Sequence, residues 1–297
     1  MSTPFFSIVI PSYNRASLLP STLESIWKQS FSDFEVLLVN DGSTDKTGEL
    51  LVSIQNEETR LEIISQENTE RGAARNNGWK NASGKYVVFF DSDDLMHPTY
   101  LQEMHKIIEA THPELVCGKI QFQDEKGGIK QHIDQKGLFG LYNYKLFLKG
   151  NPIACHFAVK NTIHAFKPFH EDRDLASMED WIFLLQNTQS RYIYIHSDPL
   201  VTMRIHSEQS MKQDQTIAQR KLQALDYLER NVQLGSKEFK LLKGYAFENI
   251  GIHFVNSRYF KDAISMFWKS FKLKGPSIKM IYNFMRMGVV FMKNHSK

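Results

Sequence analysis

Short apolar runs alternate with helical patterns over residues 6–111 of the chain. The runs at 6–11, 34–40, 61–65 and 85–91 are compact and rich in β-branched and aromatic residues, as is typical of buried strands. Apolar residues at helical spacing predict four helices in the same region, at 17–29, up to residue 54, at 72–81 and at 98–111. This alternation predicts an α/β fold in which helices cover both faces of a mostly parallel sheet.

The pattern changes twice further along the chain. Residues 115–205 are β-rich and less regular, with a hairpin turn predicted at Gly127-Gly128 and one helix beginning near Met178. Beyond residue 210 the strands stop. Helices are predicted at 215–230, 237–256, 259–272 and from 277. We therefore expect two domains, 1–210 and 211–297.

Three polar clusters follow three of the predicted strands. They are Pro11-Ser-Tyr-Asn-Arg15, Asn40-Asp-Gly-Ser-Thr-Asp45 and Asp91-Ser-Asp-Asp94. Ligands of open α/β sheets bind outside the carboxyl ends of the strands. The three clusters should therefore share one edge of the sheet and form its ligand site.

Composition narrows the class of protein. The chain has 297 residues, 42% hydrophobic and 23% charged, and a formal net charge of +3. These values are typical of a globular protein and exclude a disordered, collagen-like or disulfide-rich chain.

Cys117 and Cys155 are the only cysteines, which fits a reducing compartment. No apolar stretch is long enough for a membrane span and no basic residues lead the first apolar run, so we expect a cytoplasmic protein. The pI of 8.6 is too mild to indicate nucleic acid by itself, and the first two thirds of the chain have no basic block with interleaved aromatic residues, so we expect no nucleic-acid partner.

The cluster Asp91-Ser-Asp-Asp94 is the sharpest chemical feature. Its carboxylates would repel one another unless something positive lies between them. Such hard oxygen ligands suit Mn²⁺ or Mg²⁺ held together with substrate phosphates. The alternative is a solvated turn in which Asp94 caps the helix that begins at Pro98.

Three further motifs also have two interpretations. Asp41 could bind a nucleobase or ribose, or its segment could be a turn whose Ser43 or Thr44 caps the next helix. Asp180, in Ser177-Met-Glu-Asp-Trp181, could be a general base, or it could form a capping box with Ser177. His206 could be a metal or phosphate ligand, or an ordinary polar residue.

Taken in order, these motifs, together with Arg71-Gly-Ala-Ala-Arg-Asn-Asn-Gly78, resemble the family 2 glycosyltransferases, which are GT-A-fold enzymes using nucleotide-sugar donors. The resemblance is dense over residues 5–110 and sparse over 150–210. It implies a donor site that contains the following residues: Pro11, Tyr13, Asn14, Arg15, Asp41, Arg71, Arg75, Asp91 and Ser92. It also implies that Asp93 holds the divalent metal, with His206 close by.

The same resemblance implies that Asp180 is the general base of an inverting transfer and that Glu179 supports the acceptor site. The chain has no Gln-x-x-Arg-Trp element and no membrane spans, unlike processive synthases, which favours transfer of a single sugar. We expect a UDP-sugar as donor and a glycan or lipid-linked acceptor, in bacterial surface polysaccharide synthesis. The alternatives are a sugar-nucleotide nucleotidyltransferase, disfavoured because residues 11–15 lack glycine, and a non-catalytic nucleotide- or glycan-binding module.

The C-terminal part suggests a role of its own. Residues 244–276 resemble a single tetratricopeptide-like helical hairpin. From Phe267 to Lys297 the chain has seven Lys or Arg residues and no acidic residue, with apolar residues among them. A basic amphipathic helix is typical of a peripheral membrane element. The alternative is a helix packed on the catalytic domain with its lysines in solvent.

Overall fold

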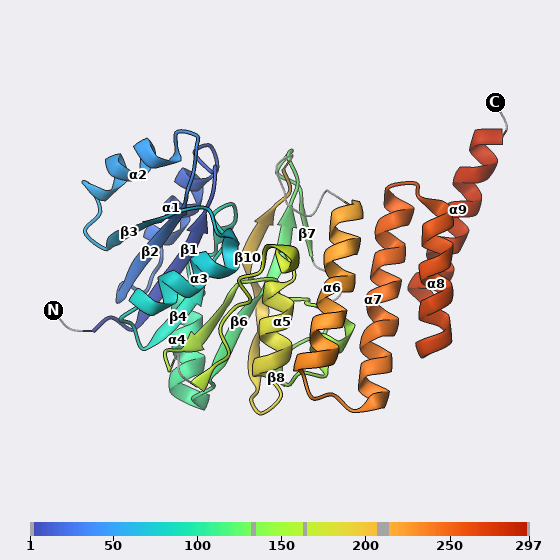
Figure 1. Ribbon diagram of the computed structural model, residues 1–297. Helices are drawn as coiled ribbons and strands as arrows, with labels where there is room; N and C mark the ends of the chain where they lie inside the picture. Colours follow the sequence, from blue (N-terminus) through green and yellow to red (C-terminus); the bar gives the residue numbers. More distant parts are fainter. Residues whose placement is uncertain (1–2, 132–134, 163–164, 207–213, 296–297) are drawn as a thin grey trace. The chain divides into compact units, whose positions relative to one another are not determined.

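The computed structural model describes residues 3–131, 135–162, 165–206 and 214–295, without the side chains of 214, 215 and 288–295. The chain divides into two compact units (Figure 1). The first consists of residues 1–144 and 151–209, and the second of residues 145–150 and 210–297. The boundary predicted near residue 210 lies outside the described residues.

The first unit is built on one mixed sheet. Its strands are β1 Phe6–Ser12, β2 Phe34–Asp41, β3 Leu61–Gln66, β4 Tyr86–Phe89, β5 Leu95–Met96, β6 Leu115–Gln123, β7 Ile129–Gln131, β8 Gly140–Tyr142, β9 Phe157–Lys160 and β10 Ile193–Arg204. The main path runs β3-β2-β1-β4-β9-β6-β10-β5. The strands β3, β2, β1 and β4 are parallel as predicted. Beyond them β9 runs antiparallel to both β4 and β6, so the sheet is parallel only in part.

Five helices belong to this unit, within its described residues. They are α1 Leu19–Trp27, α2 Thr47–Gln55, α3 Glu70–Asn81, α4 Tyr100–Thr111 and α5 Glu179–Asn187. The predicted helices are thus confirmed in number and order, with shorter or shifted ends. The helix expected from residue 98 begins at Tyr100, and Pro98 lies in the turn before it. The hairpin predicted at Gly127-Gly128 joins β6 to β7.

The core explains why the early strands are nearly continuous in apolar residues. β1 is buried along its whole length because it pairs with β2 on one side and β4 on the other. Pro11 lacks an N–H but is tolerated, because the pairing with β4 already ends at Val9. A Cβ at Gly78 would lie 2.4 Å from Cγ1 of Val9, so glycine there lets α3 pack closely on the sheet. Both cysteines are buried and free.

The second unit is helical. It contains α6 Asp214–Asn231, α7 Ser236–Asn256, α8 Phe260–Lys274 and α9 Ile278–His295. Its apolar core includes Val255, Ala263, Phe267, Met280 and Met287. None of the helices within the described residues has both the length and the apolar character needed to cross a bilayer.

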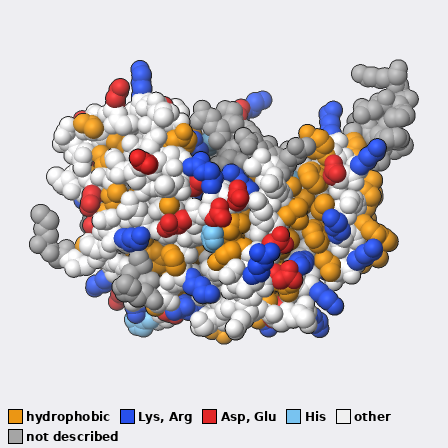
Figure 2. All heavy atoms as spheres, in the orientation of Figure 1, with side chains coloured by type: hydrophobic (Ala, Val, Ile, Leu, Met, Phe, Trp, Pro, Cys, Tyr) orange, Lys and Arg blue, Asp and Glu red, His pale blue; other side chains and the backbone are white. Residues whose placement is uncertain are grey.

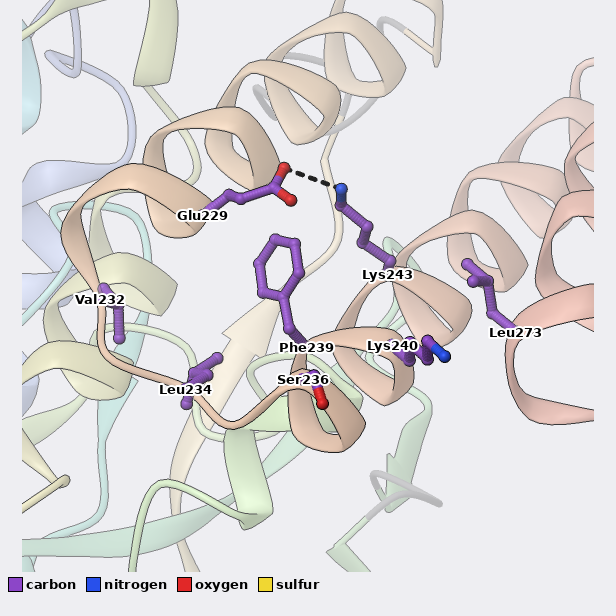
Figure 3. A pocket seen from close by; sticks show the side chains of 8 residues that line it. All are labelled: Glu229, Val232, Leu234, Ser236, Phe239, Lys240, Lys243 and Leu273. Atoms are coloured by element: carbon purple, nitrogen blue, oxygen red, sulfur yellow. Dashed lines mark hydrogen bonds and ion pairs between the residues drawn. The ribbon is translucent and has the colours of Figure 1, made fainter.

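An ion pair lies inside this helical unit, and an open pocket lies at its surface. Glu248 of α7 pairs with Lys274 of α8 at 2.8 Å, and both side chains are 4% exposed. A cavity of about 500 Å³ is lined by Glu229, Val232, Leu234, Ser236, Phe239, Lys240, Lys243 and Leu273 (Figure 3). Glu229 and Lys243 pair with each other across it at 2.8 Å.

Candidate active site

The three polar clusters lie at one edge of the sheet, as predicted. They follow the carboxyl ends of β1, β2 and β4, which are parallel neighbours. Figure 2 shows acidic side chains lying close to basic ones at the surface of the first unit. The edge therefore gathers charged groups of both signs where an α/β sheet binds its ligands.

Arg75 of α3 ties the first carboxylate of the acidic cluster to α5. Its guanidinium is 1% exposed and donates to Asp91 Oδ1 at 2.7 Å and to Glu179 Oε1 at 2.6 Å. Burial opposes ionisation of Asp91, but the positive charges of Arg75, His156 and Arg71 outweigh it and lower the pKa of Asp91. Three segments that are distant in sequence thus meet at the buried guanidinium of Arg75.

Asp93, the predicted metal ligand, faces the side chains of Arg15 and His206. Its Oδ2 lies 3.4 Å from Arg15 Nη2 and 3.2 Å from His206 Nε2, and its side chain is 20% exposed. Two atoms bound at right angles to one cation, each at about 2.1 Å, are about 3 Å apart. The spacing of Asp93 Oδ2 and His206 Nε2 therefore fits a shared Mn²⁺ or Mg²⁺.

Asp94 is paired with a histidine that sequence reasoning did not single out. Its Oδ2 lies 2.8 Å from His156 Nε2, and its Oδ1 accepts from the backbone N–H of Arg204. Burial and the neighbouring Asp93 and Asp91 raise the pKa of Asp94 to about 6, although His156 opposes them. The alternative in which Asp94 caps the following helix is wrong, because α4 begins at Tyr100 and its N-cap residue is Thr99.

Within the described residues, one further group could hold a metal. Single ligand atoms of Asp91, Asp94 and His156 all lie within 4.8 Å of one another. However, Asp91 already binds Arg75 and Asp94 already binds His156, and the last two side chains are 3% and 0% exposed. The more exposed pair of Asp93 and His206 is the more accessible place for a cation.

Asp180 lies at the start of α5 with both carboxylate oxygens engaged. Oδ1 accepts from the backbone N–H of Trp181 at 2.6 Å and Oδ2 from Asn151 Nδ2 at 2.9 Å. Burial and the charge of Glu179 raise the pKa of Asp180 from 3.8 to about 7, while Arg75 acts in the opposite direction. A carboxylate that titrates near neutrality is suited to accept a proton.

The predicted capping box at Ser177 is wrong. α5 begins at Glu179 with Met178 as N-cap residue, and no side chain caps it. Ser177 has φ +71°, and its buried Oγ has no hydrogen-bond partner. Asp180 is therefore not held by a capping box.

Asn14 joins the first two polar clusters. Its backbone N–H donates to Ser43 Oγ at 3.1 Å, and its side-chain Oδ1 accepts from the backbone N–H of Thr44 at 2.8 Å. Ser43 and Thr44 thus bind Asn14 instead of capping the next helix as predicted. Asp45 Oδ1 accepts from the N–H of Thr47, the first residue of α2. Asn14 is accordingly anchored between the loops that follow β1 and β2.

Asp41 is 3% exposed and is held by the segment that leads from β3 to α3. Its Oδ1 accepts from Gln66 Nε2 at 2.8 Å and from the N–H of Thr69 at 2.9 Å. Oδ2 receives only a long contact, 3.4 Å from Asn68 Nδ2. The carboxylate is fixed in place, and Oδ2 is the less engaged of its two oxygens.

The other residues predicted to bind the nucleotide-sugar donor differ in exposure. Tyr13 is 44% exposed, whereas Pro11 is buried and Ser92 is 6% exposed. Ser92 accepts a hydrogen bond from Thr22 through its backbone carbonyl. Arg71 is half-buried on α3. Tyr13 is therefore the most accessible of the four for stacking on a ligand.

Sequence reasoning missed Asn151, His156 and Arg204. Arg204 donates from its side chain to the backbone carbonyl of Asp93 and to Ser21 Oγ, and so holds the acidic turn. Asn151 and His156 lie in an irregular segment with no periodicity to mark them. Arg204 had a weak signal, since it lies two residues before His206.

The class of protein that the fold and the site define is an α/β protein with a charged ligand site at the carboxyl ends of its parallel strands. Comparison with known proteins specifies the class further. Residues 7–171, more than half of the chain, match the family described as Glycosyl transferase family 2. The chain is 36% identical over 128 residues to glycosyltransferase GlyA of Streptococcus pneumoniae, a match covering 43% of this chain and 18% of GlyA. It is 33% identical over 179 residues to an uncharacterized glycosyltransferase of Rickettsia felis, a match covering 59% of this chain and 29% of that protein.

Solved structures support the fold. The chain resembles S. aureus TarS 1-349 in complex with UDP-GlcNAc, with a TM-score of 0.59, 17% identity, and coverage of 88% and 89% of the two chains. It also resembles the mannosyltransferase PcManGT of Pyrobaculum calidifontis in complex with GDP-Man and Mn²⁺, with a TM-score of 0.61, 16% identity, and coverage of 98% and 81%. The GT-A fold inferred from the sequence is confirmed.

The chain belongs to glycosyl transferase family 2. The resemblance seen in its sequence motifs is thereby confirmed, whereas the tetratricopeptide-like hairpin stays a prediction. The aligned region is less than a third of the length of the two relatives named above.

Proposed function

We propose that the protein transfers one sugar from a nucleotide-sugar donor, with inversion, to a hydroxyl group of an acceptor. The observation that carries this proposal is the position of Asp180, a buried carboxylate with a pKa near 7 at the edge where the donor motifs converge. An acceptor hydroxyl is too weak an acid to ionise at neutral pH. Asp180 takes its proton as the oxygen attacks the anomeric carbon from the face opposite the leaving group.

The leaving group is a nucleoside diphosphate, so negative charge grows on its phosphate oxygens. A divalent cation at Asp93 and His206 would neutralise that charge when bound. Arg15 lies against Asp93 and places a second positive charge there. Arg75 keeps Asp91 ionised, and Glu179, on the other side of Arg75, supports the acceptor side.

The donor we propose is a UDP-sugar, and Tyr13 and Asp41 are its base-binding residues. The relative positions of the donor motifs support this, as does the likeness to a TarS structure with UDP-GlcNAc. The test is transfer or slow hydrolysis with a panel of UDP- and GDP-sugars, comparing the protein with Asp180→Asn. Turnover that is lost in the variant, while donor affinity is kept, supports the proposal. Equal turnover of both proteins would rule out Asp180 as the base.

We further propose that the acceptor is a glycan or lipid-linked intermediate of bacterial surface polysaccharide synthesis, met at the inner face of the membrane. Two helices of the second unit support peripheral binding. Exposed apolar residues follow helical spacing on α8 and α9; they are Ile264, Trp268, Phe271, Ile278, Ile281, Tyr282 and Met285. Exposed Lys269, Lys272, Lys279 and Arg286 lie among them, which complements an anionic lipid surface.

Vesicle sedimentation tests this contact. Binding to vesicles with phosphatidylglycerol but not to phosphatidylcholine alone is expected, and it should weaken in the double variant Trp268→Ser/Ile281→Ser. A matched control is Val52→Ser, since Val52 is 63% exposed on α2. Equal vesicle binding by both variants would show that the apolar residues do not contact lipid. The same conclusion would follow if the unchanged protein is a dimer and the double variant is a monomer, because the apolar residues would then form the dimer interface.

A further inference from the structure

Residues 151–156 contact both acidic groups of the site. At one end of this segment Asn151 Nδ2 donates to Asp180 Oδ2 at 2.9 Å. At the other end His156 Nε2 lies 2.8 Å from Asp94 Oδ2. The segment therefore spans from the carboxylate at the start of α5 to the acidic turn after β4.

The amide of Asn151 can lie in one orientation only. Its Oδ1 accepts from the N–H of Ile153 at 3.0 Å, while its Nδ2 also donates to the carbonyl of Ala154 at 3.1 Å. The reversed amide would place its oxygen against a carbonyl and a carboxylate, and its NH₂ group against an N–H. The hydrogen bonds within the segment therefore force Asn151 to present a donor to Asp180.

The segment is itself anchored in the core. Ile153 and Cys155 are 0% and 2% exposed. The buried side chain of Gln135 accepts from the N–H of Ile120 at 2.7 Å and donates to the carbonyl of Pro152 at 2.7 Å. Asn151 is thus a fixed donor, held by the sheet, and its geometry is set before any ligand binds.

We propose that Asn151 is a positioning residue for Asp180, holding the carboxylate in the orientation that faces the acceptor hydroxyl. The proposal rests on the proposed function, because it needs Asp180 as the base. The hydrogen bond occupies one oxygen through a rigid amide, so the carboxylate cannot rotate away from the attacking group. Alignment of this kind acts on the rate of the chemical step more than on substrate binding.

The same hydrogen bond affects the protonation of Asp180. Glu179 and Asp91 disfavour its ionised form, and Arg75 favours it. A donor to the carboxylate also favours the ionised form, so loss of Asn151 should raise the pKa of Asp180. Because the base acts when ionised, the acid limb of the rate profile should then move to higher pH.

The test compares Asn151→Ala and Asn151→Asp with the unchanged protein. Asp is matched in size and keeps an oxygen for the N–H of Ile153, but its ionised form cannot donate. We expect kcat to fall about tenfold to a hundredfold, the range for a hydrogen bond to a charged group. The acid limb of the pH profile of kcat should move to higher pH by about one unit. The Kd for the nucleotide should stay unchanged.

Asn161→Ala is the matched control. Asn161 also makes several hydrogen bonds in the first unit, to the carbonyls of Ala82 and Gly84 and from Trp79 Nε1, away from the acidic cluster. Its loss should lower the melting temperature without moving the pH profile. If Asn151→Ala does not fold, Asn151→Asp carries the comparison.

The outcomes separate this proposal from the proposed function. If Asp180→Asn abolishes transfer but both Asn151 variants keep the kcat and the acid limb of the unchanged protein, the positioning role is refuted and the base stands. If Asp180→Asn keeps transfer, Asp180 is not the base and Asn151 has nothing to position. If the Asn151 variants bind the nucleotide more weakly but keep the kcat of the unchanged protein, the residue supports binding. The positioning role is then likewise refuted.

Discussion

Removing the charge of Arg75 should be among the most destabilising single changes in the first unit. Arg75→Met keeps most of the side-chain length but leaves Glu179, which is 2% exposed, beside an apolar group. Glu179 Oε2 already has no hydrogen-bond partner. Asp91 also loses its partner, but its side chain is 23% exposed and water can compensate in part.

The magnitude follows from this difference in burial. Breaking a buried ion pair by removing one partner destabilises by about 3–5 kcal/mol, because a charge is left buried without compensation. One of the two carboxylates is nearly dry and the other is partly solvated, so we expect about 3–4 kcal/mol. That is a large part of the roughly 5–15 kcal/mol that stabilises a folded domain.

Urea unfolding followed by tryptophan fluorescence measures this loss. Three of the four tryptophans, Trp27, Trp79 and Trp181, lie in the first unit. The double variant Arg75→Met/Glu179→Gln removes both charges and should recover about half of the loss or more.

Arg60→Met is the matched control. Arg60 pairs with Glu58 at the surface and its side chain is 34% exposed. Its removal should cost about 1–2 kcal/mol, because the guanidinium also lies over the rings of Trp27 and Phe34. A loss of less than about 1 kcal/mol for Arg75→Met, or a double variant less stable than the single one, would refute the reasoning from buried charge.

Three more predictions follow from the site and its core. Because the pKa of Asp180 is raised from 3.8 to about 7, the folded state binds its proton more tightly, and stability falls as pH rises through that window; between about pH 4 and 7 the unchanged protein should therefore lose up to about 4 kcal/mol in urea unfolding relative to Asp180→Asn, whose amide carries no charge, and the same pH dependence in both proteins would contradict this. The kcat of the unchanged protein should show an acid limb near pH 7, and a flat profile down to about pH 5 would exclude Asp180 as the group that must ionise. Gly78→Ala should destabilise by about 1–3 kcal/mol because its Cβ would lie 2.4 Å from Val9 Cγ1; an unchanged melting temperature would show that α3 can shift.

The sequence predicted the first half of the fold well, because local signals and tertiary structure agree there. Continuous apolar strands such as β1 and β2 can be recognised from their residues alone. The three polar clusters were located because they follow the carboxyl ends of β1, β2 and β4. The antiparallel insertion of β9 between β4 and β6 was not predictable, since short strands carry no mark of direction. Helix ends were also misplaced, as at Pro98, where a turn precedes α4.

Within the candidate site, the acidic cluster was found from the repulsion of its carboxylates, and the cations that relieve it lie far away in sequence. Arg75 was identified through its motif. His156 and Asn151 were missed because their roles depend on a loop path that no periodicity encodes. The capping role expected of Ser177 was wrong because Ser177 adopts a positive φ and the N-cap residue is Met178, a shift of one residue that spacing alone does not reveal.

The central claim is a nucleotide-sugar site built around a metal at Asp93. Thermal-shift measurements with UDP, GDP, dTDP and CMP, each with and without Mn²⁺, test it most directly, using the unchanged protein and Asp93→Ala. We predict that UDP raises the melting temperature of the unchanged protein only when Mn²⁺ is present, and that Asp93→Ala loses this response. No shift with any nucleotide, or an equal shift in Asp93→Ala, would contradict the claim.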